Sequence, residues 1–207
     1  MERPEVDGDE LGTGRLACAV PVMRGRWAAG IVPRNFTWVI KDRLAVSERP
    51  GGYASNHRKV RRHEELLWLR AQNFDRIVSL LPGSHNLHAY DELGLVWSHF
   101  PMTSTDQLQP LGEFYGSLVA WLRRGERVLL HQDELGDNVM GVVAGYLLWS
   151  RILADEPQAI TVVEQLLRRQ MGRPGRVIVS LAGELPPPSM PAGDAPFSTG
   201  ATAEPPA

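Results

Sequence analysis

The sequence predicts an α/β domain with a mostly parallel central sheet that is flanked by helices. Three observations support this prediction. Short runs rich in valine, isoleucine and leucine recur along residues 31–184, and they lack the alternating polar positions of a half-exposed strand. Segments with the three- and four-residue apolar spacing of amphipathic helices separate these runs. Such alternation of strands and helices is typical of a parallel sheet that is covered on both faces.

The expected strands are apolar runs that stop at turn-forming residues. The first two enclose Lys41-Asp42, as in a hairpin, and the third ends at Pro82. The fourth ends at Pro101, and the fifth follows the turn at Gly125. In chain order, we expect these strands at residues 36–40, 43–47, 77–81, 95–100 and 127–131.

The expected helices carry apolar residues at helical spacing. One helix shows the pattern at Leu111, Phe114 and Leu118, and Pro110 lies near its start, where a missing amide hydrogen is tolerated. Another is apolar nearly all round, which predicts a buried helix. In chain order, the helices are expected at residues 58–72, 110–123, 139–154 and 158–171, with a short last element at 176–181.

The two ends of the chain differ in composition from the middle. Residues 1–14 are acidic and rich in glycine, and residues 1–30 as a whole mix glycine, acidic and short apolar segments without a sustained period, so we expect a flexible leader there. Residues 185–207 are rich in proline, alanine, serine and threonine, so they cannot bury enough apolar surface to offset the entropy of ordering. We therefore expect a disordered proline-rich tail, with the α/β domain confined to residues 31–184.

The bulk properties exclude several classes of function. A net charge of −2 and a pI of about 6.3 provide no basic surface for nucleic acid or an anionic membrane. The longest apolar run, residues 139–153, contains Arg151 and is shorter than the roughly 20 residues that span a bilayer. The single cysteine, Cys18, excludes an intrachain disulfide and fits a reducing compartment. With no signal-peptide pattern at the start, we expect a soluble, cytoplasmic protein.

The loop between residues 127–131 and the buried helix is the expected site, because ligands in such folds bind beyond the carboxyl ends of the strands. Its residues are, in order, His131, Gln132, Asp133, Glu134, Leu135, Gly136, Asp137 and Asn138. The strand VLLH, the five residues 133–137 and the following helix AGYLLW resemble the H-C-x5-R signature of cysteine-dependent phosphatases. The segment NFTWVIKDRLAVSERPG resembles the opening of bacterial dual-specificity-like members, and Phe100–Met102 with Pro110 resembles their general-acid region. Over residues 34–181 the chain is similar to the protein-tyrosine/dual-specificity phosphatase superfamily.

The resemblance also identifies what this chain lacks. It places Gln132 at the family's nucleophilic cysteine, Asn138 at its phosphate-binding arginine and Ser104 at its general-acid aspartate. A glutamine amide is not a nucleophile, and asparagine cannot offer a charged bidentate fork to a phosphoryl group. If its loop were shifted, Asp106 could supply the general acid, but without a nucleophile there would be little for it to protonate. Together these changes should abolish the family's reaction.

The charge of the loop points in the same direction. Asp133, Glu134 and Asp137 lie where backbone amides would converge on a phosphate. A carboxylate about 6 Å from a phosphate charge repels it by roughly 3 kcal/mol at an effective dielectric constant near 20, whereas a helix N-terminus attracts it by only about 1 kcal/mol. Leu135 stands where the family usually has glycine, and Gly136 follows it. We therefore expect phosphate binding to be lost.

Some of these residues have simpler roles. Asp137 or Asn138 could cap the buried helix, since both residue types favour helix starts. His131 with the three loop acids could gather a metal ion, but one histidine near several acids is a common pattern. We expect His131 to orient the loop by hydrogen bonding, with neither a metal nor a cofactor present.

The basic run at residues 57–63 is the second candidate site. Arg58, Arg61 and Arg62 could bind an acidic partner or a phosphopeptide, or they could simply form the solvated start of a helix. The leading hypothesis is a catalytically inactive, phosphatase-like protein (a pseudophosphatase) that serves as a binding or regulatory module for a protein partner, without nucleic acid or membrane. One alternative is an active phosphatase-like hydrolase that uses the unorthodox acidic loop. Another is a scaffold with a vestigial pocket and a tethering tail.

Overall fold

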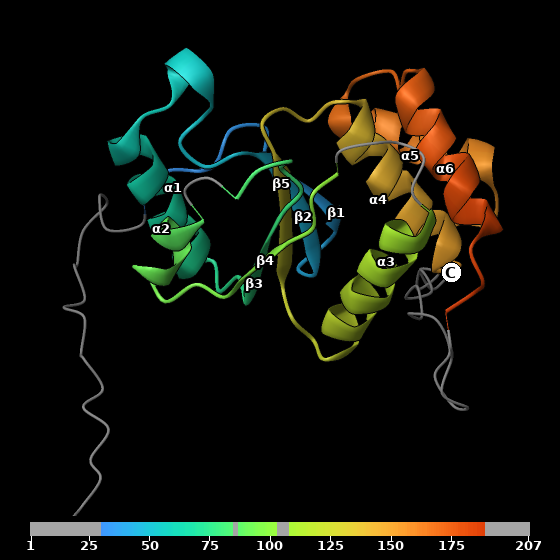
Figure 1. Cartoon of the computed structure of the whole chain (residues 1–207), viewed down its shortest axis with the longest axis horizontal. Coiled ribbons are helices and arrows are strands. Elements are labelled where there is room, and N and C mark those ends of the chain that lie inside the picture. Colours follow the sequence, from blue (N-terminus) through green and yellow to red (C-terminus); the bar gives the residue numbers. More distant parts are fainter. Residues whose placement is uncertain (1–29, 85–86, 103–107, 189–207) are drawn as a thin grey trace, which may run out of the picture.

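A five-stranded sheet runs through the middle of the molecule (Figure 1). The computed structural model describes residues 30–84, 87–102 and 108–188. The strands are β1 (Thr37–Ile40), β2 (Leu44–Glu48), β3 (Arg76–Ser79), β4 (Trp97–His99) and β5 (Val128–Gln132). They are arranged in the order β1-β2-β5-β3-β4, and only the β1–β2 pair is antiparallel. The predicted mostly parallel sheet is therefore confirmed.

Helices cover both faces of this sheet (Figure 1). α1 and α2 lie on one face, and α3 to α6 lie on the other. The helices are α1 (Lys59–Ala71), α2 (His88–Asp91), α3 (Leu108–Arg123), α4 (Asp137–Trp149), α5 (Glu156–Leu167) and α6 (Arg173–Glu184), and a 3-10 turn spans Ala54–Asn56. The prediction of an α/β domain with flanking helices is confirmed, while the predicted leader and tail lie largely outside the described residues.

The central strand β5 joins two hydrophobic cores. Val128 and Leu130 belong to the larger core beneath α3–α6, whereas Leu129 belongs to the smaller core beneath α1 and α2. All three side chains are fully buried. Successive side chains of a strand point to opposite faces, so a strand between two cores is apolar at every position. This explains why the strand sequences lack alternation.

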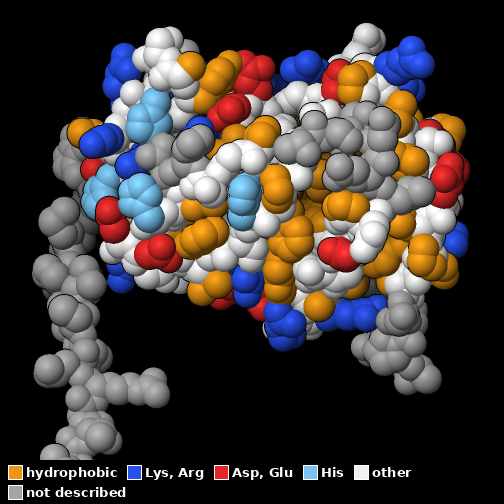
Figure 2. Space-filling model, viewed as in Figure 1, with side chains coloured by type: hydrophobic (Ala, Val, Ile, Leu, Met, Phe, Trp, Pro, Cys, Tyr) orange, Lys and Arg blue, Asp and Glu red, His pale blue; other side chains and the backbone are white. Residues whose placement is uncertain are grey.

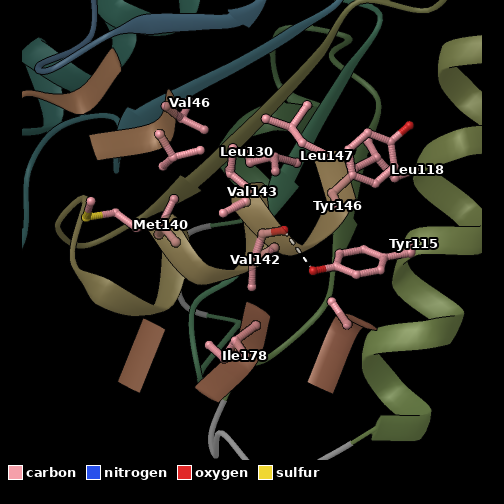
Figure 3. Packing of buried hydrophobic residues seen from close by; sticks show 14 of the residues in the cluster. Val46, Tyr115, Leu118, Leu130, Met140, Val142, Val143, Tyr146, Leu147 and Ile178 are labelled. Carbon is pink, nitrogen blue, oxygen red and sulfur yellow. Dashed lines mark hydrogen bonds between the residues drawn. The ribbon is translucent and has the colours of Figure 1, made fainter. Parts of the chain in front are cut away.

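The larger core is built around α4, which is buried nearly all round as predicted (Figure 3). A Cβ atom added at Gly141 would lie 2.5 Å from the Gly175 carbonyl oxygen of α6. One added at Gly145 would lie 2.5 Å from the Tyr115 hydroxyl, which donates a 2.8 Å hydrogen bond to the Val142 carbonyl (Figure 3). The two glycines therefore let α3 and α6 pack directly against the backbone of α4.

Two element boundaries differ from the sequence expectation. The short last element expected at 176–181 is a 12-residue helix, α6, with Pro174 in its first turn, where proline is favourable. Its buried face includes Ile178, Val179 and Ala182. α4 ends at Trp149 instead of residue 154, and Arg151 just beyond it has a φ of 62°. Within the residues that the structure describes, none of the helices has the length and apolar character needed to cross a membrane.

Candidate functional site

The loop of residues 131–138 connects β5 to α4 at the carboxyl ends of three neighbouring parallel strands. In the sheet, His131 is paired with Ser47 of β2 and Ser79 of β3. These three side chains and Glu65 are the fully buried polar residues of the described chain. The sheet thus places polar groups together at the edge where the sequence predicts the site.

His131 is held beneath the loop as a neutral side chain. Its Nε2 atom lies 2.9 Å from the hydroxyl of Tyr90 in α2, and the imidazole is fully buried. Burial, together with the smaller effect of the positive charge of Arg49, lowers the pKa of His131 to about 3. Its Nδ1 atom has no hydrogen-bond partner among the described residues. The histidine thus ties β5 to α2, and its predicted role in orienting the loop stays a prediction.

Gln132 is the last residue of β5 and stands at the start of the loop. Its side-chain nitrogen is 3.5 Å from the carbonyl oxygen of Leu80, to which it donates weakly. Its backbone carbonyl accepts a 2.6 Å hydrogen bond from the Arg49 amide. The position that follows the buried histidine therefore presents a neutral carboxamide directed toward the end of β3.

All three acidic side chains of the loop have partners within the chain. An Oδ1 atom of Asp133 lies 3.2 Å from Nη1 of Arg49. The Tyr53 hydroxyl donates to Glu134, and this hydrogen bond is the main reason that the pKa of Tyr53 is raised. The residues that bind these two acids come from the segment 49–53 after β2. This segment therefore fastens the loop from outside.

The third acid, Asp137, fastens the loop to α6. Its Oδ1 atom accepts a 3.1 Å hydrogen bond from the amide of Gly172, the residue that caps the N-terminus of α6, and lies 3.8 Å from Nη2 of Arg169. The prediction that Asp137 or Asn138 caps α4 is wrong, because the N-cap residue is Gly136 and both residues lie within the first helical turn. Asp137 acts instead as the capping carboxylate of a different helix.

Comparison with protein-family models gives no match, and comparison with curated proteins gives none either. Solved structures do match. The active form of Tk-PTP has a TM-score of 0.58 and 19% identity, over 72% of this chain and 97% of its own. Kinase associated phosphatase, with its catalytic-site cysteine replaced by serine, has a TM-score of 0.60 and 19% identity, over 70% and 91%. Human DUSP28 has a TM-score of 0.53 and 17% identity, over 75% and 97%.

The chain has the fold of the dual-specificity and tyrosine phosphatases. The predicted phosphatase-like fold is thus confirmed by comparisons that cover almost the whole length of each matched structure. Two residues predicted from the family's acid loop, Ser104 and Asp106, lie outside the described residues. Gln132 ends β5 and Asn138 lies in the first turn of α4; that they stand at the family's cysteine and arginine stays a prediction.

The central loop residue packs inward in this phosphatase-like fold. Leu135 is 8% exposed and belongs to the larger core. Gly136 has a φ of −87°, which any residue adopts, so this glycine does not supply a left-handed turn. Apolar burial of Leu135 therefore anchors the loop to the larger core.

The basic run at the start of α1 is largely engaged in local contacts. Arg61 lies 2.7 Å from Glu65, which is fully buried and also accepts a 2.6 Å hydrogen bond from the Gly51 amide. Arg62 contacts the ring of His57 at 3.2 Å. Arg58 is exposed and donates to backbone carbonyls beside it. The structure thus places the three arginines together, and two of them also stabilise the fold. Figure 2 shows histidines gathered at this end of the molecule, over α1 and α2.

A groove of about 640 Å³ lies beside the loop, between the start of β1 and the end of α5. It is lined by Asn35, Phe36, Thr37, Glu48, Glu134, Leu135, Leu166, Leu167, Arg168 and Arg169. Only two loop residues, Glu134 and Leu135, reach it. The groove was missed from the sequence, as were Arg49 and Tyr53, because its walls come from segments far apart in the chain. In the described part of the chain, no three His, Cys, Asp or Glu side chains gather in a way that could hold a metal ion.

Proposed function

We propose that this chain is a catalytically inactive, phosphatase-like protein that works as a binding module for another protein. The observation that carries the proposal is Gln132, a carboxamide at the end of β5, the position that the sequence resemblance gives to the family's nucleophile. Phosphoryl transfer in this family begins with attack by a thiolate, which then has to leave again. A neutral amide can do neither.

The opposite end of the loop supports the same proposal. Asn138 lies in the first turn of α4, where the family's arginine would bind the phosphoryl oxygens as charge develops. A neutral amide provides no charge and no bidentate fork. The pairing of Asp133, Glu134 and Asp137 with neighbouring donors argues against the alternative of an acidic-loop hydrolase, because these carboxylates are engaged in holding the loop.

The proposal includes a protein partner in the cytoplasm, and it includes neither nucleic acid nor a membrane. The charge of −2 and the single cysteine support this part of it. Of the three arginines in the basic run, Arg58 is the one whose replacement changes the surface without breaking a buried contact. A partner that binds this run should therefore be lost on Arg58→Glu.

A turnover assay tests the loss of catalysis. The purified chain is offered an aryl phosphate and a phosphotyrosine peptide, beside the double variants Gln132→Cys/Asn138→Arg and Gln132→Ser/Asn138→Arg. We expect the natural chain and the serine variant to match a buffer blank, because neither has a thiolate, and the cysteine variant to exceed it. Turnover by the natural chain that disappears in Asp133→Asn/Glu134→Gln would overturn the proposal in favour of the acidic-loop hydrolase.

A further inference from the structure

The turn between α5 and α6 carries a cluster of positive charge. Its sequence, RRQMGRPGR, contains four exposed arginines in nine residues. Arg176 lies 3.1 Å from Glu164, and Arg169 is 3.8 Å from Asp137. The backbone amide of Arg168 donates to the Glu164 carbonyl, but the side chains of Arg168 and Arg173 have no ion pair or hydrogen bond with any described residue. We call Arg168, Arg169 and Arg173 the α5–α6 ridge, and basic side chains are visible at this end of the molecule in Figure 2.

The ridge stands between two hollows of the surface. Arg168 and Arg169 line both the groove of about 640 Å³ beside the loop and a shallower hollow of about 380 Å³ along α5. Arg168 ends α5 in the left-handed region, with a φ of 52°. Glycine is the residue that adopts this conformation without cost, so arginine there is not explained by the turn alone.

The charges on the two sides of the groove differ in their partners. Glu48 accepts a 2.6 Å hydrogen bond from Asn35, and Glu134 accepts one from Tyr53. On the opposite side, the side chain of Arg168 has no internal partner within the described chain. This unpaired positive charge is free to bind a ligand. The α5 side of the groove therefore attracts a negatively charged ligand.

The shape and floor of the groove favour an extended peptide. It begins along Asn35, Phe36 and Thr37, which lead into β1, and β1 is an edge strand of the sheet. An edge strand presents backbone groups to which an extended segment can hydrogen-bond. Phe36, with the leucines of α5, supplies apolar surface for the side chains that point inward.

We propose that the α5–α6 ridge and this groove bind an extended acidic segment of a partner protein, with its aspartate or glutamate side chains on Arg168 and Arg169. This inference rests on the proposed binding function, and it gives that function a surface other than the start of α1. Guanidinium groups pair with carboxylates through two parallel hydrogen bonds. Asp137 places the ridge next to the altered loop, because it contacts both Arg169 and the start of α6.

Fluorescence anisotropy with the full chain tests the site. The probe is a labelled peptide of sequence Glu-Val-Glu-Thr-Glu-Val-Glu-Thr, and its glutamine analogue is the uncharged comparison. We expect the acidic peptide to bind at low salt, to bind at least tenfold more weakly to Arg168→Glu/Arg169→Glu, and to lose affinity as salt is raised. The matched control is Arg70→Glu/Arg151→Glu, which changes the net charge equally at two exposed residues, one in the last turn of α1 and one just after α4, neither of which lines the groove, and it should retain binding within about twofold.

The outcomes separate this inference from the proposed function. Equal weakening by the two double variants would overturn the ridge as the site, because only net charge would then matter. If the natural chain fails to bind the acidic peptide and its turnover equals that of the buffer blank, the inference is overturned. The proposal that the chain is catalytically inactive then still stands.

Discussion

The loop of residues 131–138 and the α5–α6 ridge are both charged turns that lead into a helix, and they use their charges differently. In the loop, each of the three carboxylates meets a donor from another segment. In the ridge, Arg168 and Arg173 meet none within the described chain. The loop's charges therefore hold the fold together, whereas charges of the ridge remain available to a partner.

The largest expected effect is the loss of folding stability at low pH that follows from the burial of His131 in β5. His131 is neutral in the folded chain down to a pH of about 3, whereas in the unfolded chain it takes up a proton below about 6.5. Stability should therefore be complete above 6.5 and fall as the pH drops, by about 1.4 kcal/mol per pH unit, or roughly 4 kcal/mol near pH 3.5. Urea unfolding across this range measures it. His131→Asn removes the titrating group, so an equally steep pH dependence in that variant would contradict the prediction.

The next effect tests the packing of α4 against α6, the helices that follow the loop and the ridge. Gly141→Ala should destabilise the chain by about 2 kcal/mol, because the new Cβ would lie 2.5 Å from the Gly175 carbonyl oxygen. Gly183→Ala in α6 is the matched control, since the nearest atom to its Cβ is 3.8 Å away. Thermal unfolding should separate the two variants. Equal midpoints would mean that α4 and α6 do not pack as closely as described.

A smaller effect is expected where the loop and the ridge meet. Asp137→Ala removes the carboxylate that caps α6, which should cost about 1 to 2 kcal/mol and increase amide exchange at Gly172. Asp155→Ala is a comparable cap loss at α5, where the aspartate accepts a 2.8 Å hydrogen bond from the Gln158 amide. Only the first should raise exchange in the loop. If both variants changed the loop equally, Asp137 would not be the link between the two regions.

The smallest effect concerns the outer fastening of the loop. Tyr53→Phe deletes the hydroxyl that bonds to Glu134, and because that pair is exposed we expect no measurable shift of the unfolding midpoint. Hydrogen exchange of residues 133–136 should nevertheless rise, since one of the contacts that restrain the loop is gone. Unchanged exchange would show that Arg49 and the core position of Leu135 hold the loop without Tyr53.

Local patterns were sufficient to predict most of the fold. The apolar run of β5 and the all-round apolar α4 were visible because each pattern depends on neighbouring residues only. The length of α6 was missed, because its apolar run Val177–Val179 is short and follows Pro174 and Gly175, and only the contact with α4 identifies it as part of a buried helix face. The pattern of one helix does not show which partner will cover it.

In the site too, features that depend on neighbouring residues could be predicted, and contacts between distant segments could not. The strand, loop and helix around residues 131–138 could be predicted because their order depends on neighbouring residues only. That Gln132 and Asn138 stand at the family's cysteine and arginine stays a prediction. The repulsive role given to Asp133 and Glu134 depended on where their side chains point. Their partners, Arg49 and Tyr53, precede them by more than 80 residues, so no spacing rule connects them.

The close approach of α4 and α6 has a consequence for synthesis on the ribosome. α6 is the last helix of the described chain, and its glycine-lined contact covers one side of the most apolar helix. Until α6 has emerged from the exit tunnel, the nascent chain leaves that apolar surface of α4 uncovered, and exposed apolar surface of this kind promotes aggregation. A premature stop before Arg173 is therefore expected to yield an aggregation-prone product, even though all five strands of the described sheet and the loop of residues 131–138 would already have been made.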